Sequence, residues 1–215
     1  MSGIFILNVF VLFCIANVNC FLLVHENIQR NVTKILTVPN GGPWGTWRTK
    51  EFCAAGSYAV GYNLKIEPPQ GGGDDTGVNA LVLRCATIEG LYAGTVHSGE
   101  GAWGNWVAQD PKYCDSREGV HHFMTGFSLY VEGDQGAGDD SEVDFVNFKC
   151  RDFAAKTPEY DLTLSPGHGV WGSWGPASQS CDPNSAICGF MSRIEDPQGG
   201  GDDTALNDIK MYCCT

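Results

Sequence analysis

Residues 61–85 read GYNLKIEPPQGGGDDTGVNALVLRC, and two later stretches, 126–150 and 189–213, follow the same pattern without a gap. In each copy a glycine precedes an aromatic residue, a shared glutamate precedes a shared glutamine, and a glycine-rich bend with two aspartates leads to a closing cysteine. A long pattern that occurs three times indicates one structural unit used three times.

Each copy of this pattern predicts a β-hairpin. Apolar residues occupy every second position in 60–66 and 125–131, and side chains alternate in the same way from Asn79 to Cys85. This period of two is typical of strands. The bend from Gln70 to Asp75 supplies glycines that accept positive φ and aspartates that bond nearby backbone N–H groups, so we expect it to be the hairpin loop.

A second motif, Gly-x-Trp-Gly-x-Trp, precedes each hairpin and contains all six tryptophans, at 42–47, 101–106 and 169–174. We expect one strand before each motif (35–38, 95–97 and 162–164) and one through or just after it, hence about four strands per repeat. No window shows capped helical periodicity.

The chain is therefore expected to be all-β, with repeats at about 33–85, 92–150 and 160–214. Three four-stranded antiparallel sheets that face inwards as a β-prism, with pseudo-threefold symmetry, share one core. A three-bladed propeller would leave its inner strands too little room to pack.

The first twenty residues read as a signal peptide. They carry no charge, and an apolar run from Ile4 to Ala16, interrupted by Asn8, is followed by small residues. The run is shorter than the roughly 20 residues needed to cross a bilayer. We expect residues 21–215 to form a single secreted, extracellular domain with no membrane insertion.

The cysteine count supports export. Loss of Cys14 and Cys20 with the signal leaves eight of the ten cysteines, an even number that is typical of disulfides in an exported chain. The repeat relates one cysteine after each Trp motif to the cysteine that closes the hairpin. The expected pairs are Cys53–Cys85, Cys114–Cys150, Cys181–Cys213 and Cys188–Cys214, and an exchange of Cys213 with Cys214 stays open.

Charge and motifs exclude several classes of function. The net charge of -12 argues against nucleic acid and anionic membranes as partners. The histidines show no zinc spacing and the Gly-Asp bends lack the alternating ligands of a calcium loop, so no metal and no cofactor is expected. Asn31 begins the one N-glycosylation sequon, Asn-Val-Thr.

The tryptophans have two interpretations. Exposed indoles stack on sugar rings, whereas a tryptophan at a fixed place in every repeat is suited to filling a shared core or covering a sheet end. Recurrence favours the second interpretation. The glycan-binding candidates are Trp44, Trp47, Trp103, Trp106, Trp171 and Trp174.

The carboxylates also have a structural and a catalytic interpretation. Glycoside chemistry needs one protonated and one ionised carboxyl group. Acids that recur three times are expected to stabilise the loops. A catalytic pair would combine one recurring glutamate with an acid that breaks the symmetry. The recurring candidates are Glu67, Glu132 and Glu195, and the symmetry-breaking ones are Asp134, Glu142, Asp144, Asp196 and Asp208.

The triplicated Trp motif, the Pro-x-Gly-Gly-Gly-Asp-Asp-Thr bends at 69–76 and 197–204, and the cysteine layout resemble the vitelline membrane outer layer protein 1 family. The resemblance covers residues about 33 to 214. It implies a β-prism, a secreted protein first associated with the outer layer of egg coats, and a proposed activity on chitin-type oligosaccharides. The second repeat departs from the pattern at Gly133-Asp134, Ala137 and Ser141.

Three functional hypotheses follow. We expect a non-enzymatic, disulfide-braced structural protein of an extracellular or egg coat, with coat or matrix components as partners. The first alternative is lectin-like binding of glycans that contain N-acetylglucosamine. The second is glycosyl transfer or hydrolysis on chitooligosaccharides. Fold alone does not separate these classes.

Overall fold

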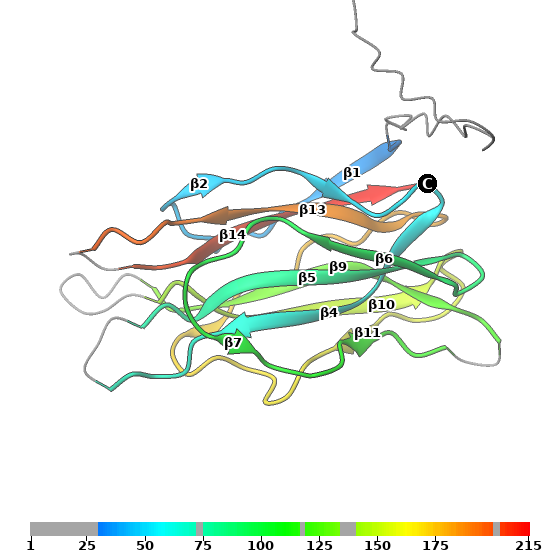
Figure 1. Ribbon diagram of the computed structural model, residues 1–215. Helices are drawn as coiled ribbons and strands as arrows, with labels where there is room; N and C mark the ends of the chain where they lie inside the picture. The colour runs from blue at the N-terminus through cyan, green and yellow to red at the C-terminus, as the bar shows by residue number, and fades with distance from the viewer. Residues whose placement is uncertain (1–29, 72–74, 117–118, 134–140, 200–202) are drawn as a thin grey trace, which may run out of the picture.

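The computed structural model describes residues 30–71, 75–116, 119–133, 141–199 and 203–215. The predicted signal peptide and the candidate Asp134 lie outside this part of the chain. The described residues form fourteen strands in three antiparallel sheets, so the all-β expectation is confirmed (Figure 1).

Each sheet is built around one long hairpin, and these are the three hairpins that the repeated stretch predicts. Their strands are nine or ten residues long because the alternating pattern continues beyond the residues first recognised. The hairpins are β4 (Ser57–Ile66) with β5 (Val78–Thr87), β9 (His122–Val131) with β10 (Val143–Asp152), and β13 (Ala186–Ile194) with β14 (Leu206–Cys214). We call them the first, second and third sheet.

The strands that flank each hairpin come from the next repeat. In the first sheet, β6 (Tyr92–His97) pairs with β5, and β7 (Asn105–Trp106), inside the second Trp motif, pairs with β4. In the second sheet, β11 (Tyr160–Leu162) and β12 (Ser173–Trp174) take the same places. The sheets are therefore offset from the sequence repeats.

The third sheet closes this ring. Here β1 (Val32–Leu36) pairs with β14, and β2 (Thr46–Trp47) pairs with β13, so the first repeat completes the sheet of the last. The two ends of the described chain lie side by side, and Asn31 Nδ2 donates to Thr215 Oγ1 at 3.1 Å. Figure 1 shows β1 beside β14 near the C-terminus.

Two sheets contain one strand more than expected. After the Trp motif, β3 (Glu51–Phe52) returns to β13, and β8 (Lys112–Tyr113) returns to β4. The corresponding segment of the third repeat makes single backbone bonds to β9, from Ser178 N to Phe127 O and from Cys181 N to Thr125 O. All three sheets thus contain the four strands expected. The additional short strands β3 and β8 come directly before Cys53 and Cys114.

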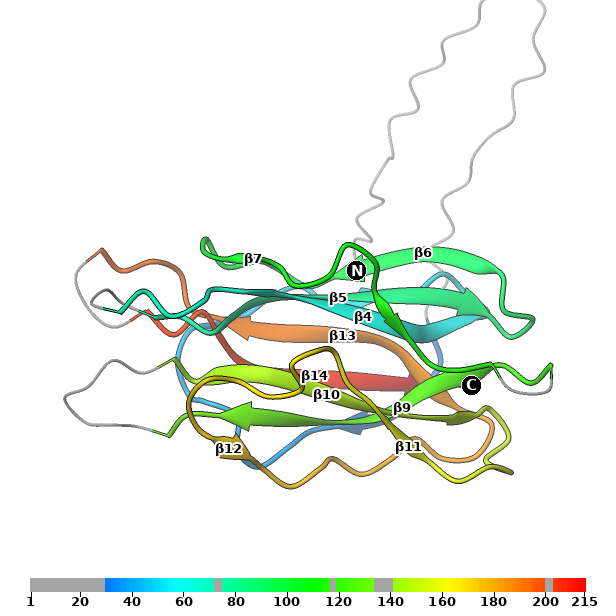
Figure 2. The same cartoon turned by 90° about the horizontal axis from the view of Figure 1, so that it is seen from below.

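The three sheets form a prism around one core. Strands β4, β9 and β13 contact one another pairwise, and one buried cluster contains residues of all three hairpins (Figure 2). The aromatic residues that follow the repeated glycines, Tyr62, Phe127 and Phe190, are fully buried in it. The Tyr62 hydroxyl donates to Val146 O at 3.0 Å, so this buried polar group has a hydrogen-bond partner.

Disulfides connect the faces of the prism. Cys53 follows β3 of the third sheet and is bonded to Cys85 on β5 of the first. Two further bonds connect the first sheet to the second and the second to the third, and the fourth lies within the β13–β14 hairpin. These bonds are Cys114–Cys150, Cys181–Cys213 and Cys188–Cys214, so all four pairs match those expected from the repeat.

The Trp motifs and the inter-sheet disulfides occupy opposite halves of the prism. On β4, Lys65 is paired with Trp106, whereas Ala59 is paired with Cys85. Six residues of strand separate these positions, which corresponds to about 20 Å. Figure 1 shows β2 and β7, and Figure 2 shows β7 and β12, at the end of the prism where β4, β9 and β13 finish.

The second glycine of each Trp motif occupies a position where the backbone leaves no room for a side chain. Gly45, Gly104 and Gly172 have φ of 70°, 78° and 102°. A β-carbon on Gly104 would lie 2.4 Å from the carbonyl of Ile66, because the motif backbone packs directly on the end of β4. The other two glycines make the same approach to β13 and β9. A side chain here would combine an unfavourable φ with a steric clash.

We therefore expect Gly104→Ala to lower the free energy of unfolding by about 3 kcal/mol or more, measured by urea denaturation. Gly56→Ala is the matched control, because Gly56 has φ of 73° with nothing within 4 Å of an added β-carbon. It should lose only about 1 kcal/mol. Equal losses in the two variants would contradict the close backbone approach.

Candidate functional site

The candidate site is found where one position of the repeat changes chemistry. Asn79 and Asn207 hold equivalent positions in the first and third repeats, and Asp144 holds that position in the second. Asn79 Oδ1 accepts a bond from Trp103 N at 3.0 Å, and its Nδ2 donates to Thr76 Oγ1 at 2.5 Å. Asn207 makes the same pair of contacts. The amide thus connects a hairpin loop to the Trp motif packed on it.

Asp144 can reproduce only part of this arrangement when it is ionised. Its Oδ2 accepts a bond from Trp171 N at 2.8 Å. Ser141, the counterpart of Thr76, donates its hydroxyl proton to Glu132 Oε2 at 2.8 Å. One hydroxyl proton cannot serve both carboxylates, whereas a protonated Asp144 can donate as the asparagine amide does.

The surroundings of Asp144 favour that neutral form. Burial raises the pKa of Asp144 to about 6, and the charges of Glu132 and Asp75 act in the same direction. The hydrogen bond from Trp171 N and the neighbouring Ser141 hydroxyl oppose the rise without cancelling it. This side chain therefore exchanges a proton close to neutral pH, which few carboxyl groups do.

Asp144 lies in a groove of about 350 Å³. We call it the Asp144 groove. It brings together two candidate acids and two candidate tryptophans, namely Glu67, Asp144, Trp106 and Trp171. The rest of its wall is mostly apolar and comes from Ile66, Pro68, Pro69, Val107, Phe145, Pro166 and Val170, with His168 beside them.

The symmetry-related position between the third and first sheets is closed. Its lining residues Glu195, Pro197, Ala205, Asn79 and Trp103 correspond one by one to residues of the Asp144 groove, but the space between them is too small to admit a water molecule. One difference is at Gly77, the counterpart of Ala205. A β-carbon on Gly77 would lie 2.5 Å from Asp144 Oδ1, so glycine leaves room at this carboxyl group.

The recurring acids brace the hairpin loops, as the repeat suggests. Glu67 Oε2 accepts the hydroxyl of Thr76 at 2.8 Å, and Glu132 and Glu195 accept those of Ser141 and Thr204 in the same way. Asp75 and Asp203 accept bonds from the backbone N–H groups of Gln70 and Gln198. Of the three glutamates, Glu67 alone also lines the Asp144 groove.

Three further candidate acids lie outside the groove lining. Glu142 is buried with φ of 52°. Asp196 forms an exposed ion pair with Arg48 at 2.5 Å. Asp208 accepts a bond from Ile209 N, and burial raises its pKa. Of the described candidate acids, only Asp144 and Glu67 line the Asp144 groove.

Of the two structural roles expected for the tryptophans, their exposure fits covering the ends of the sheets and does not fit filling the shared core. Trp44, Trp103, Trp106 and Trp174 are 39–55% exposed, and Trp47 and Trp171 are half-buried. They cover the ends of the sheets because their short strands pair with the last residues of β4, β9 and β13. Trp174, for example, packs edge-on against Tyr130 at a centroid distance of 5.3 Å.

Other features bear on ligands and location. Asn31 is exposed, in keeping with its role as a candidate glycosylation site. The described residues contain no cluster of three side chains able to hold a metal ion. In the same part of the chain, no helix has the length and apolar character needed to cross a membrane.

Sequence reasoning missed His168 and Gly77. His168 lines the groove and contacts Gly169 O through Nδ1 at 2.7 Å. The signal was the segment Gly167-His168-Gly169, which is found before the third Trp motif alone. Gly77 could have been found by asking which loop positions differ between the aligned copies.

Comparison with known proteins gives both sequence and structural matches. The family model described as Vitelline membrane outer layer protein I matches residues 34–215. A human protein named vitelline membrane outer layer protein 1 homolog is 40% identical over 190 residues, covering 86% of this chain and 85% of the relative. The mouse protein of the same name is 38% identical over 197 residues, covering 88% and 90%.

Solved structures with similar topology are more distant. Artocarpin, described as a lectin with mannose specificity, has 12% identity and a TM-score of 0.48, covering 87% of this chain and 100% of its own. A single-chain recombinant jacalin has 17% identity and a TM-score of 0.42, covering 89% and 99%.

The position of Asp144 predicts how stability varies with pH. Its pKa rises from 3.8 in the unfolded chain to about 6 on folding, so the folded state holds the proton more tightly. The contribution of Asp144 to the free energy of unfolding is fully present below about pH 3.8 and is lost as the pH rises through about 6. Asp144→Asn should therefore be more stable than the natural chain at pH 7.5, by about 3 kcal/mol, with a smaller difference at pH 4.

Urea denaturation at the two pH values measures this difference. Asn79→Asp is the reciprocal control, since it places a carboxyl group at the equivalent position and should lose stability between pH 4 and pH 7.5. An Asp144→Asn variant that follows the pH dependence of the natural chain would contradict the assignment.

Proposed function

The chain belongs to the vitelline membrane outer layer protein I family, and on this basis we propose that it is a secreted, disulfide-braced structural protein of an extracellular or egg coat. The observation that carries the proposal is the set of three disulfides that connect the three sheets in a closed ring. Disulfides of this kind persist in oxidising, extracellular surroundings.

The ring suits a protein that must last outside the cell. Opening one face of the prism would require its neighbours to move, because each face is bonded covalently to both others. Each inter-sheet bond also closes a loop of 32 or 36 residues, which restricts the unfolded chain. In the chain-entropy model each bond contributes about 4 kcal/mol.

Removal of one inter-sheet bond tests the structural part of this proposal. We expect Cys114→Ala/Cys150→Ala to lower the free energy of unfolding by about 4 kcal/mol and to shorten survival in a protease digest. The control is Cys188→Ala/Cys214→Ala, which removes the bond within one hairpin and leaves the ring closed. We expect its protease survival to exceed that of the first variant.

Secretion and coat association are measured on the full chain. When it is expressed in cells with a secretory pathway, we expect it in the medium, cleaved near residue 20, carrying glycan on Asn31 and retained by isolated coat material. A chain that stays in the cytosol with free thiols, or that washes freely from coat material, would overturn the proposal.

A second candidate function is supported by the Asp144 groove. Two indole rings beside a carboxyl group whose pKa is about 6 form a surface able to stack on a sugar ring and bond its hydroxyl and amide groups. Glycans that contain N-acetylglucosamine match this chemistry. If the groove also transfers or hydrolyses glycosyl groups, Asp144 would be the acid and Glu67 the ionised partner.

Binding of chitotetraose, measured by calorimetry at pH 6, tests this candidate. We expect saturable binding that weakens at least tenfold in Trp106→Ala. Trp44→Ala is the control, because Trp44 is exposed and lies outside the groove lining. The chain-length distribution of the sugar after incubation reports turnover. Absence of binding, or equal loss in both variants, would reject the groove as a glycan site.

A further inference from the structure

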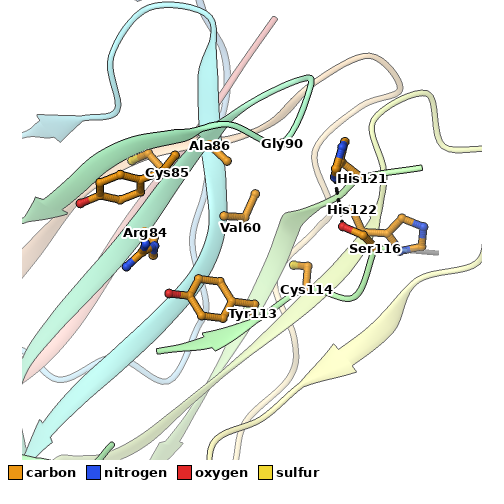
Figure 3. A pocket seen from close by; sticks show the side chains of 11 residues that line it. Val60, Arg84, Cys85, Ala86, Gly90, Tyr113, Cys114, Ser116, His121 and His122 are labelled. Atoms are coloured by element: carbon orange, nitrogen blue, oxygen red, sulfur yellow. Dashed lines mark hydrogen bonds between the residues drawn. The ribbon is translucent and has the colours of Figure 1, made fainter. Parts of the chain in front are cut away.

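A second pocket lies on the first sheet, toward the half of the prism that holds the inter-sheet disulfides. It has a volume of about 300 Å³, and Cys85 and Cys114 form part of its wall. Figure 3 shows Arg84 and Tyr113 at one side, His121 and Ser116 at the other, and Val60 and Ala86 between them. We call it the Arg84 pocket.

Arg84 is held between two aromatic rings. Its guanidinium carbon lies 4.1 Å from the ring centroid of Tyr92 and 5.4 Å from that of Tyr113. The pairing of strands creates this arrangement, because Ala86 is opposite Tyr92 and Gly61 is opposite Tyr113. A β-carbon on Gly61 would lie 2.7 Å from the Tyr113 ring, so glycine lets that ring lie flat on the strand.

The guanidinium donors of Arg84 are available to a ligand. The other four described arginines, Arg30, Arg48, Arg151 and Arg193, donate to oxygen atoms of the protein. Arg84 is half-buried, yet it makes no hydrogen bond or ion pair with any residue in the described ranges. Its five N–H donors suit two oxygens of a carboxylate or sulfate group.

This arrangement is absent from the other two sheets. The positions equivalent to Arg84 are Lys149 in the second sheet and Tyr212 in the third. The positions equivalent to Tyr113 are Ser180 and Phe52. The cation between two tyrosines is therefore a local feature of one face, whereas features that hold the prism together recur three times.

The opposite side of the pocket offers further hydrogen-bonding groups. Ser116 Oγ lies 3.0 Å from His121 Nδ1. The His121 ring rests on Gly90, where a β-carbon would be 2.3 Å away and φ is 81°. The floor between the two sides, Val60 and Ala86, is apolar. A ligand that fits has an anionic group at one side, a hydroxyl group at the other, and an apolar face between them.

The nearby acids interact with the histidines. Glu89 interacts electrostatically with His121, and Asp152 with His122. Among the described residues that line the pocket, Arg84 is the only arginine or lysine. A single cation that two aromatic rings flank suits a ligand that carries one anionic group.

We propose that the Arg84 pocket binds an acidic sugar unit, a pyranose that carries one carboxylate or one sulfate group. The oxyanion accepts the donors of Arg84, the C–H face of the ring lies against Tyr92 or Tyr113, and a ring hydroxyl reaches Ser116 and His121. The pocket volume is at the lower limit for ligand sites, which fits one monosaccharide unit. This site is separate from the Asp144 groove and does not depend on the function proposed for that groove.

The test measures binding of glucuronic acid and of N-acetylglucosamine 6-sulfate to the full secreted chain, by protein-observed NMR at 0.15 M salt. At this ionic strength the repulsion from the acidic surface is screened beyond about 8 Å. We expect saturable shifts of first-sheet signals with at least one acidic sugar, and binding at least tenfold weaker for glucose. Which acidic sugar binds more tightly distinguishes carboxylate from sulfate recognition.

Arg84→Gln should weaken this binding at least tenfold, and Arg84→Lys should restore only part of it because a lysine cannot donate two parallel bonds. Lys149→Gln is the matched control, since it removes the same charge at the equivalent position and should leave binding unchanged. Acetate or sulfate ions that bind as tightly as the sugars would overturn the proposal. So would absence of binding, an acidic peptide that binds in preference, or equal losses in Arg84→Gln and Lys149→Gln.

Discussion

The structure depends on the packing of each Trp motif against the hairpin of the preceding repeat. The motif backbone lies so close to the hairpin that only glycine fits, as at Gly104 against Ile66. An asparagine or aspartate side chain of the hairpin then bonds the backbone N–H of the tryptophan, as Asn79 does for Trp103. Since this contact joins neighbouring repeats, no repeat completes a sheet alone. The first repeat must reach the last, and the prism forms as one closed unit.

The two ends of the prism consequently differ in chemistry. At the loop end, the tryptophans cover the sheets and remain partly exposed, so this end carries the surface that can contact ligands. Toward the other end, disulfides connect the faces and the two ends of the described chain lie together. The long hairpins, the Trp motifs and the inter-sheet disulfides all follow the threefold symmetry. It fails at Asp144 and at Arg84, and each of these residues lies in a pocket.

Much of this fold could be predicted from the sequence, because alternation and glycine-rich bends are local signals. The hairpin from Ser57 to Thr87 and the cysteine pairs follow from the repeat. The exchange of strands between repeats could not be read in this way, since alternation shows which side chains face inwards but not which strand lies beside β4. Recurrence indicated a structural role for the tryptophans, but it could not show that they cover the ends of the sheets and stay partly exposed. Asp144 could be listed among several acids, but its raised pKa depends first on its burial and then on neighbours such as Ser141 and Glu132, which come together only in the folded chain.

The central claim is that the first Trp motif and the third hairpin unfold only together, as parts of one closed ring. Native-state hydrogen exchange of the oxidised chain tests it most directly. The amides to follow are those of Gly42 in the motif and of Arg48 and Cys53 after it. They donate to Asn207 O, Ser192 O and Cys188 O of the third hairpin. The account predicts that these amides exchange with the same free energy as amides in the centre of β13, equal to that of global unfolding. Exchange of the first Trp motif at a distinctly lower free energy, while β13 stays protected, would contradict it.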